Sequence, residues 1–80
     1  MVYINIPYIP ENNRIDRDTA IKEIESLDIN EDAKYETLKA IYNRLPRGVD
    51  LDTPKQATQL EKVLSRLGVP YRQSEESEFV

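Results

Sequence analysis

Hydrophobic residues recur at every second position over Val2–Tyr8, at the start of the chain. A period of two in a segment rich in β-branched and aromatic residues predicts a β-strand with one buried face. Pro7 cannot donate a backbone hydrogen bond, so we expect the strand either to end near it or to lie at the edge of a sheet. The polar segment 10–14 (PENNR) then predicts a loop.

Two helices are predicted next, because hydrophobic residues now recur at spacings of three and four. Asp16 or Asp18 can cap the first helix, which should run for about ten residues. Asn30 is a suitable N-cap for the second helix, and Pro46 forces that helix to stop, because the residue before a proline avoids helical geometry. The spacing predicts that the second helix buries one stripe, made of Tyr35, Leu38, Ile41, Tyr42 and Leu45.

A third helix has the clearest boundaries, in the segment TPKQATQLEKVLSRLGVPYR (53–72). Thr53 at the N-cap, Pro54 at the first helical position and Gln56 at the third predict a capping box. Gly68 is the residue type that commonly ends a helix in left-handed geometry. The predicted buried stripe of this helix consists of Ala57, Leu60, Val63, Leu64 and Leu67.

Two further short strands complete the predicted fold, one over 49–52 and one from Val69 onward. The order is therefore β-α-α-β-α-β. It predicts an α+β fold, a two-layer sandwich in which three helices cover one face of a three-stranded antiparallel sheet. We expect residues 1–73 to form a single domain and residues 74–80 to form an acidic, flexible tail. The terminal Phe79-Val80 pair has three open interpretations: a short linear motif captured through its carboxylate, a segment that folds back onto the sheet or adds an extra strand, or a tail with no role.

The residue types that are missing exclude several kinds of chemistry. The 80 residues contain neither His nor Cys, which excludes disulfides, thiolate metal sites and a Ser-His nucleophile. Only two glycines are present, which excludes a glycine-rich phosphate-binding loop. The acidic pairs adjoin predicted helix starts, where capping and the helix dipole account for them: Asp16/Asp18, Glu31/Asp32 and Asp50/Asp52. We therefore expect no enzyme, no metal and no cofactor.

Hydrophobic runs of only a few residues predict no membrane partner. The first residues lack the basic and hydrophobic regions of a signal peptide, so a cytoplasmic location is expected. The net charge of −4 is unevenly distributed. Residues 1–38 contain nine acids and four bases, residues 39–72 contain three acids and seven bases, and residues 73–80 contain three acids and no base. The chain is therefore polarised along its sequence, which raises the question of its partners.

One basic stripe stands out on the predicted third helix, because its members recur at spacings of four, three and four residues. We call Lys55, Gln59, Lys62 and Arg66 the basic stripe. At 100° per residue they share one face, roughly opposite the leucines. Such a stripe is either ordinary solvated surface or a docking face for an acidic partner.

The chain also resembles a known family over roughly residues 19–72. The segments TAIKEIESL, EDAKYETLKAIYNRLP and GVDLDTPKQATQLEKVLSRLGVPY have the helix-proline-strand-helix-glycine-strand rhythm of the C-terminal domain of the bacterial ribosomal stalk protein L7/L12. The adaptor ClpS is similar in general layout. The resemblance implies the same α+β fold. Because lysines on the first two helices of stalk domains receive translation factors, it also implies a partner-binding role for Lys22 and Lys34.

The sequence therefore predicts a small non-enzymatic protein-interaction module, of adaptor or inhibitor type, that docks an acidic partner surface. The residues expected to bind this partner are Lys55, Gln59, Lys62, Arg66 and Arg72, with Lys22 and Lys34 added by the resemblance. The alternative is a weak RNA-binding or single-stranded nucleic-acid-binding domain. It would use Lys55, Lys62, Arg66 and Arg72, and bases would stack on a platform formed by Tyr3 and Tyr71.

Overall fold

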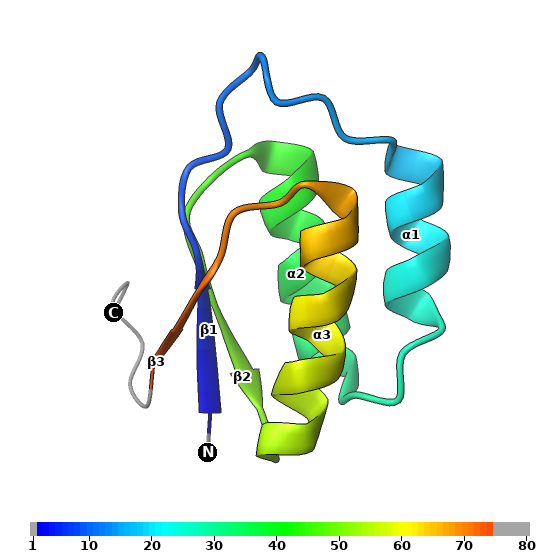
Figure 1. Cartoon of the computed structure of the whole chain (residues 1–80), viewed down its shortest axis with the longest axis vertical. Coiled ribbons are helices and arrows are strands. Elements are labelled where there is room, and N and C mark those ends of the chain that lie inside the picture. Colours follow the sequence, from blue (N-terminus) through cyan, green and yellow to red (C-terminus); the bar gives the residue numbers. More distant parts are fainter. Residues whose placement is uncertain (1, 75–80) are drawn as a thin grey trace.

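A computed structural model describes residues 2–74, which form three helices and a three-stranded antiparallel sheet (Figure 1). In chain order the elements are β1 (Val2–Ile6), α1 (Arg17–Glu25), α2 (Glu31–Asn43), β2 (Arg47–Leu51), α3 (Pro54–Leu67) and β3 (Arg72–Ser74). The predicted α+β fold, its element order and its antiparallel sheet are confirmed. The three helices lie on one side of the sheet, where α2 and α3 contact the strands and α1 packs on α2 and α3. β3 includes Ser74, the first residue of the expected tail, and residues 75–80 with the Phe79-Val80 pair lie outside the described residues.

β1 is the central strand of the sheet, with β2 and β3 antiparallel on its two sides. Directly opposed residues in antiparallel strands place their side chains on the same face. Ile4 and Val49 are such a pair, and both are fully buried under the helices. Tyr3 and its partner Asp50 therefore belong to the opposite face. Pairing ends at Ile6, directly before Pro7, so this proline ends the central strand and does not mark an edge.

The first two helices begin at side-chain caps that the sequence predicts. Asp16, rather than Asp18, caps α1, because its Oδ1 accepts a hydrogen bond of 3.3 Å from the backbone N–H of Thr19. Asn30 caps α2 in the same way, through a 2.7 Å bond from the N–H of Ala33 to its Oδ1. Each cap satisfies one of the N–H groups that a helix start leaves without an intrahelical acceptor.

The Asp16 cap makes stability depend on pH. The backbone N–H of Thr19, helped by the Thr19 hydroxyl, holds the pKa of the Asp16 carboxyl below its ordinary value of 3.8. A lowered folded-state pKa stabilises the fold at pH values above the unfolded-state pKa, and this contribution is lost as the pH falls through the lowered value. Asn caps a helix but does not ionise. We therefore expect the wild type to lose stability relative to Asp16→Asn as the pH falls from about 5 to about 2. The measurement is the difference between their free energies of unfolding, obtained by urea denaturation at each pH. A difference that stays constant over this range would contradict the ionised cap.

α2 is buried mainly through small residues, and only part of the predicted stripe is covered. Its buried residues are Ala33, Thr37, Ala40 and Ile41. Of the predicted stripe, Ile41 is buried and Leu38 half-buried, whereas the prediction is wrong for Tyr35, Tyr42 and Leu45, which are 57%, 40% and 51% exposed. Small side chains allow α2 to lie close to β2 and α1, since the distance between packed elements depends on the side chains at the contact. The buried Thr37 hydroxyl is satisfied within the helix, because it donates a 2.7 Å bond to the carbonyl of Ala33.

α2 also ends earlier than its proline predicts. The helix stops at Asn43, and Arg44 follows in left-handed geometry with φ of 54°. The Arg44 side chain then crosses to the loop between β1 and α1, where it donates hydrogen bonds to the carbonyls of Ile9, Pro10 and Asn13. The end of α2 is therefore determined by a long-range contact as well as by Pro46.

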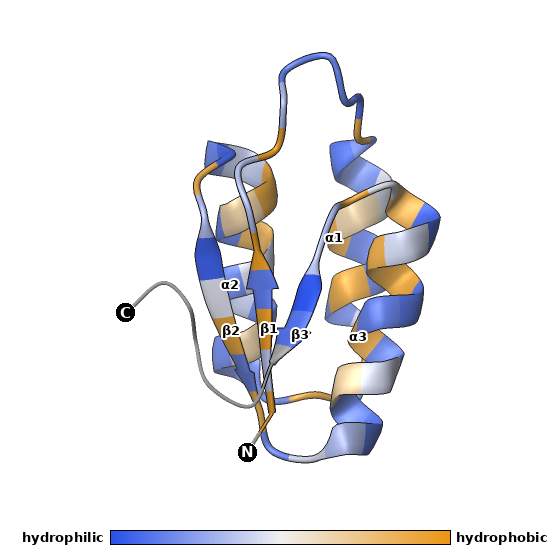
Figure 2. Ribbon diagram, turned by 60° about the vertical axis from the view of Figure 1, so that its left-hand side comes forward, coloured by the Kyte–Doolittle hydropathy of each residue, from blue (hydrophilic) through white to orange (hydrophobic). Residues whose placement is uncertain are grey.

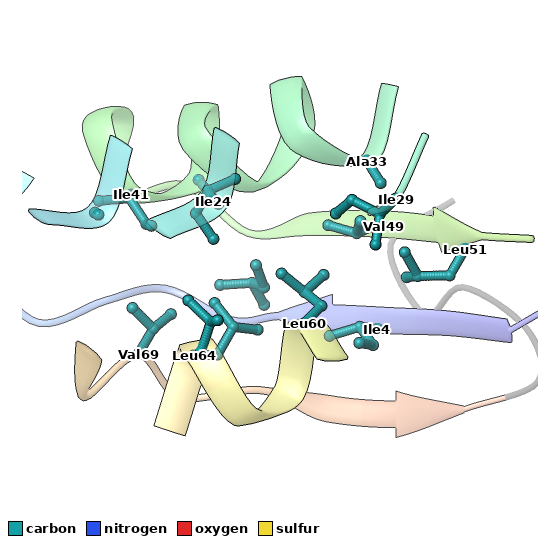
Figure 3. Close-up of a cluster of buried hydrophobic side chains, with 14 of the residues drawn as sticks. Ile4, Ile24, Ile29, Ala33, Ile41, Val49, Leu51, Leu60, Leu64 and Val69 are labelled. Atoms are coloured by element: carbon teal, nitrogen blue, oxygen red, sulfur yellow. The ribbon is translucent and has the colours of Figure 1, made fainter. Parts of the chain in front are cut away.

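α3 confirms most of its predicted signals. Thr53 Oγ1 accepts a 3.2 Å bond from the N–H of Gln56, and Gly68 ends the helix in left-handed geometry with φ of 76°. The side chain of Gln56 accepts from the N–H of Asp52, one residue before the donor of a standard capping box. Four of the five predicted stripe residues are buried, and Leu67 is half-buried. Leu60 and Leu64 extend from α3 toward the strands, in the cluster that also holds Ile4 and Ile24 (Figure 3).

Candidate functional site

The basic stripe lies on the side of α3 that faces away from the core. Lys55, Lys62 and Arg66 are exposed and Gln59 is half-buried, whereas Leu60 and Leu64 on the other side of the helix are fully buried. The helix that carries the stripe is capped at both ends, by Thr53 and Gly68. The spacing of the stripe on a regular helix therefore places its side chains on one surface, as the sequence predicts.

The cations of the basic stripe differ in what they contact. Arg66 reaches α1, where its Nη2 lies 3.4 Å from Glu23 Oε1, and the two side chains are 65% and 31% exposed. This ion pair connects α3 to α1. Within residues 2–74, neither Lys55 nor Lys62 has an ion-pair or hydrogen-bond partner. The two lysines are therefore the cations of the stripe that are available to a partner molecule.

An open groove of about 450 Å³ adjoins the basic stripe, between α3 and the chain that leads into β3. We call it the α3 groove, and it is lined by Thr58, Glu61, Lys62, Ser65, Arg66 and Tyr71. The Ser65 hydroxyl donates a 3.3 Å bond to the Tyr71 hydroxyl, which connects the two sides. The groove therefore combines two cations with three hydroxyl groups and a single carboxylate, a set that suits an anionic or polar group of a partner.

The position of Tyr71 corrects the predicted last strand. Val69 is buried and Tyr71 lies beside α3, so the chain pairs with β1 only from Arg72 onward. β3 is consequently a three-residue edge strand, and it is hydrophilic along its length (Figure 2). Sequence reasoning missed Thr58, Glu61 and Ser65 as groove residues, because their proximity to Tyr71 arises only when this segment folds back along α3.

The remaining predicted binding residues lie elsewhere. Arg72 is exposed on β3 and pairs in register with Asn5, on the sheet face that points away from the helices. Lys22 is exposed in the last turn of α1. Lys34 is largely covered, with a side chain that is 16% exposed; its Nζ donates a 2.9 Å bond to the carbonyl of Glu25 and lies 3.6 Å from Glu31 Oε1. Lys34 therefore connects the start of α2 to the end of α1, and the seven predicted residues do not form one surface.

The predicted stacking platform is not formed. Tyr3 belongs to the sheet face that points away from the helices, whereas the Tyr71 hydroxyl contacts Ser65 on α3. The two rings therefore lie on different sides of the sheet and do not stack a common ligand.

Acidic residues gather where the end of β2 lies beside the start of α2. A hollow of about 320 Å³ there is lined by Asn30, Glu31, Asp32, Asp50 and Asp52. The Asn30 side chain joins the two segments through a 3.2 Å bond from its amide to the carbonyl of Asp50. Among residues 2–74, no group of three or more acidic side chains is placed to hold a metal ion. In the sequence these acids are accounted for as separate helix caps. Their proximity in space is visible only in the fold.

Comparisons with known proteins assign no family to this geometry. The chain matches no protein-family model, no curated protein and no solved structure. The resemblance to ribosomal stalk domains therefore stays a prediction. None of the helices in residues 2–74 combines the length and hydrophobicity needed to cross a bilayer.

Proposed function

We propose that this chain is a cytoplasmic, non-enzymatic protein-interaction module of adaptor or inhibitor type, and that it binds an acidic surface of a protein partner through the basic stripe. The observation that supports this proposal is the pair of exposed lysines, Lys55 and Lys62, on a capped helix, with no ionic partner within residues 2–74. Arg66 and Gln59 extend the same surface, although Arg66 also pairs with Glu23 of α1.

The charge distribution supports an oriented encounter with such a partner. The whole chain carries a net charge of −4, whereas the basic stripe and the α3 groove contain a single acid, Glu61. An acidic partner is therefore attracted to this surface and repelled by the acidic hollow beside Asp50 and Asp52. Complementary charge of this kind raises the association rate and determines the orientation of binding.

The α3 groove adds hydrogen-bonding groups and an aromatic contact to the charged surface. Its hydroxyl groups, from Thr58, Ser65 and Tyr71, offer donors and acceptors beside the Lys62 ammonium group. Tyr71 is 37% exposed and its hydroxyl accepts a bond from Ser65, so its ring lies beside α3 and is accessible to a partner side chain. Tyrosine is enriched among the residues that contribute most to protein-protein binding.

A charge-reversal pair tests the proposal. We expect Lys55→Glu/Lys62→Glu to weaken binding to the partner by about tenfold or more, because both uncompensated cations become repulsive anions. The measurement is affinity capture from a native lysate of the source cells, followed by titration with the purified partner. Both substitutions are at exposed positions and leave the Arg66–Glu23 pair in place, so the fold should be retained.

The comparison variant is Arg14→Glu/Lys22→Glu, which changes the net charge by the same amount at two other exposed positions, one of them the Lys22 that the stalk resemblance implies as a binding residue. Partner binding by this variant should remain close to that of the wild type. If the comparison variant loses binding and Lys55→Glu/Lys62→Glu retains it, the surface implied by the stalk resemblance is the binding site and the basic stripe is solvated surface. If nuclease abolishes the capture and binding falls steeply with salt, the partner is a nucleic acid and the proposal is wrong.

A further inference from the structure

The outward side of α2 carries a row of hydrophobic residues, of which three are exposed and one, Leu38, is partly buried against the core. We call Tyr35, Leu38, Tyr42 and Leu45 the aromatic seam. Five large hydrophobic residues are exposed in the described part of the chain, and three of them, Tyr35, Tyr42 and Leu45, belong to this seam. Single exposed hydrophobic residues are ordinary, whereas a contiguous group marks an interaction surface.

The spacing of the aromatic seam indicates the shape of its partner. Its three helical members, Tyr35, Leu38 and Tyr42, recur at intervals of three and four residues, which is the a/d pattern of a helix that packs against another helix. From Tyr35 to Tyr42 the row extends over about 10 Å of helix axis at 1.5 Å per residue. Tyr35, Leu38 and Tyr42 lie on α2 itself, whereas Leu45 follows the left-handed Arg44 just past the end of the helix. A complementary surface of this length and spacing is another α-helix.

The charges beside the seam indicate what kind of helix it accepts. The Lys39 ammonium lies 5.1 Å from the centre of the Tyr35 ring, and the Arg17 guanidinium lies 5.4 Å from that of Tyr42. Glu36, the acid on α2 closest in sequence to Lys39, already pairs with Arg47 at 3.7 Å, and within residues 2–74 neither Lys39 nor Arg17 has an ion-pair partner. The cations that flank the rings are therefore not neutralised by acids of α2, and they favour a partner helix with carboxylates.

We propose that the aromatic seam binds an amphipathic α-helix of another protein, with hydrophobic residues at heptad spacing and acidic residues beside them. Tyr35 and Tyr42 are the anchors, because a tyrosine ring contributes hydrophobic contact while its hydroxyl stays in water. Carboxylates of the partner helix pair with Lys39 and Arg17 over these rings. The seam shares no residue with the basic stripe, so this site is additional to the proposed function.

A second copy of this chain is the less suitable occupant. In a symmetric dimer that packs the seams of two copies together, the two-fold axis passes near the middle of the seam, next to Lys39. Such a contact brings the Lys39 side chains of the two copies together, and like charges at an interface oppose binding. A helix with glutamates in the flanking positions has no such conflict.

Two synthetic helical peptides test the proposal against the isotope-labelled chain by nuclear magnetic resonance. Both contain about three heptads with leucine at positions a and d, and they differ in having glutamate or lysine at positions e and g. We expect the glutamate peptide to shift the amide resonances of residues 35–45 and of Arg17. We expect the lysine peptide to bind at least about tenfold more weakly, because it is repelled by Lys39 and Arg17.

Variants separate this site from the rest of the surface. Tyr35→Gln/Tyr42→Gln should weaken binding of the glutamate peptide by about tenfold or more, with an unchanged circular dichroism spectrum, because both positions are exposed. Tyr8→Gln, at another exposed tyrosine, should bind like the wild type. Lys55→Glu/Lys62→Glu should also bind like the wild type, so a failure of the basic stripe and a failure of the seam are distinguishable.

Three results would overturn the proposal. The first is equal binding of the two peptides, which removes the role of the flanking cations. The second is a set of shifts on α3 in place of α2, which assigns the peptide to the basic stripe. The third is concentration-dependent dimerisation in sedimentation experiments that Tyr35→Gln/Tyr42→Gln abolishes, which makes a second copy the occupant.

Discussion

Leu64→Ala is expected to lower the free energy of unfolding by about 2–5 kcal/mol, as measured by urea denaturation followed by circular dichroism. The Leu64 side chain is fully buried, in the cluster between α3, the strands and Ile24 of α1 (Figure 3). Its truncation removes buried methyl groups and leaves a cavity that surrounding side chains fill only in part. A domain of this size has a total stability of about 5–10 kcal/mol, so the loss is a large share of it.

The matched control is Leu45→Ala, the same truncation at a leucine that is 51% exposed. It should cost less than about 1 kcal/mol, because a half-exposed side chain contributes less buried area. A loss well under 1 kcal/mol for Leu64→Ala would mean that the buried stripe of α3 is assigned to the wrong face. Similar losses for the two variants would mean that Leu45 is buried in the protein in solution.

The comparison of α3 with α2 shows which parts of this fold the sequence predicts. In α3 the local signals agree, because Thr53 and Gly68 mark its two ends and the large hydrophobic residues between them are the buried ones. In α2 two rows with helical spacing compete. One contains Tyr35 and Tyr42 and the other contains Ala33 and Ala40, and the row of small residues is buried. Periodicity identifies both rows but does not choose between them, because the choice depends on how closely the helix approaches β2 and α1.

The candidate site likewise contains features that the sequence predicts and features that only the tertiary structure shows. The basic stripe follows from spacing alone once α3 is recognised as a helix. The α3 groove does not, because it requires Tyr71 to leave the strand and contact Ser65. The availability of each cation is also a tertiary property. Arg66 and Lys34 have partners on or beside α1, Glu23 and the carbonyl of Glu25, which no local pattern indicates.

The end of α2 is a further case in which a tertiary contact replaces a local signal. Pro46 predicts that the helix stops, but the residue that leaves helical geometry is Arg44, with φ of 54°. Its Nη1 lies 3.4 Å from the carbonyl oxygen of Ile9 and 2.7 Å from that of Pro10, and its Nη2 lies 3.1 Å from that of Asn13. The guanidinium therefore holds the loop between β1 and α1 against the end of α2. The left-handed geometry is unfavourable for a residue with a Cβ, so these contacts offset a local cost.

Two substitutions at this residue separate the contacts from the backbone geometry. Arg44→Ala removes the charged donors and is expected to lower the free energy of unfolding by about 1.5–3 kcal/mol, since hydrogen bonds from charged groups contribute that much. Arg44→Gly loses the same bonds but adopts positive φ without a steric penalty, so it should be about 1 kcal/mol more stable than Arg44→Ala. Urea denaturation of the wild type and both variants measures the two effects together. Equal stability of the two variants would contradict the left-handed geometry, and a wild-type value for Arg44→Ala would show that the three bonds do not hold the loop.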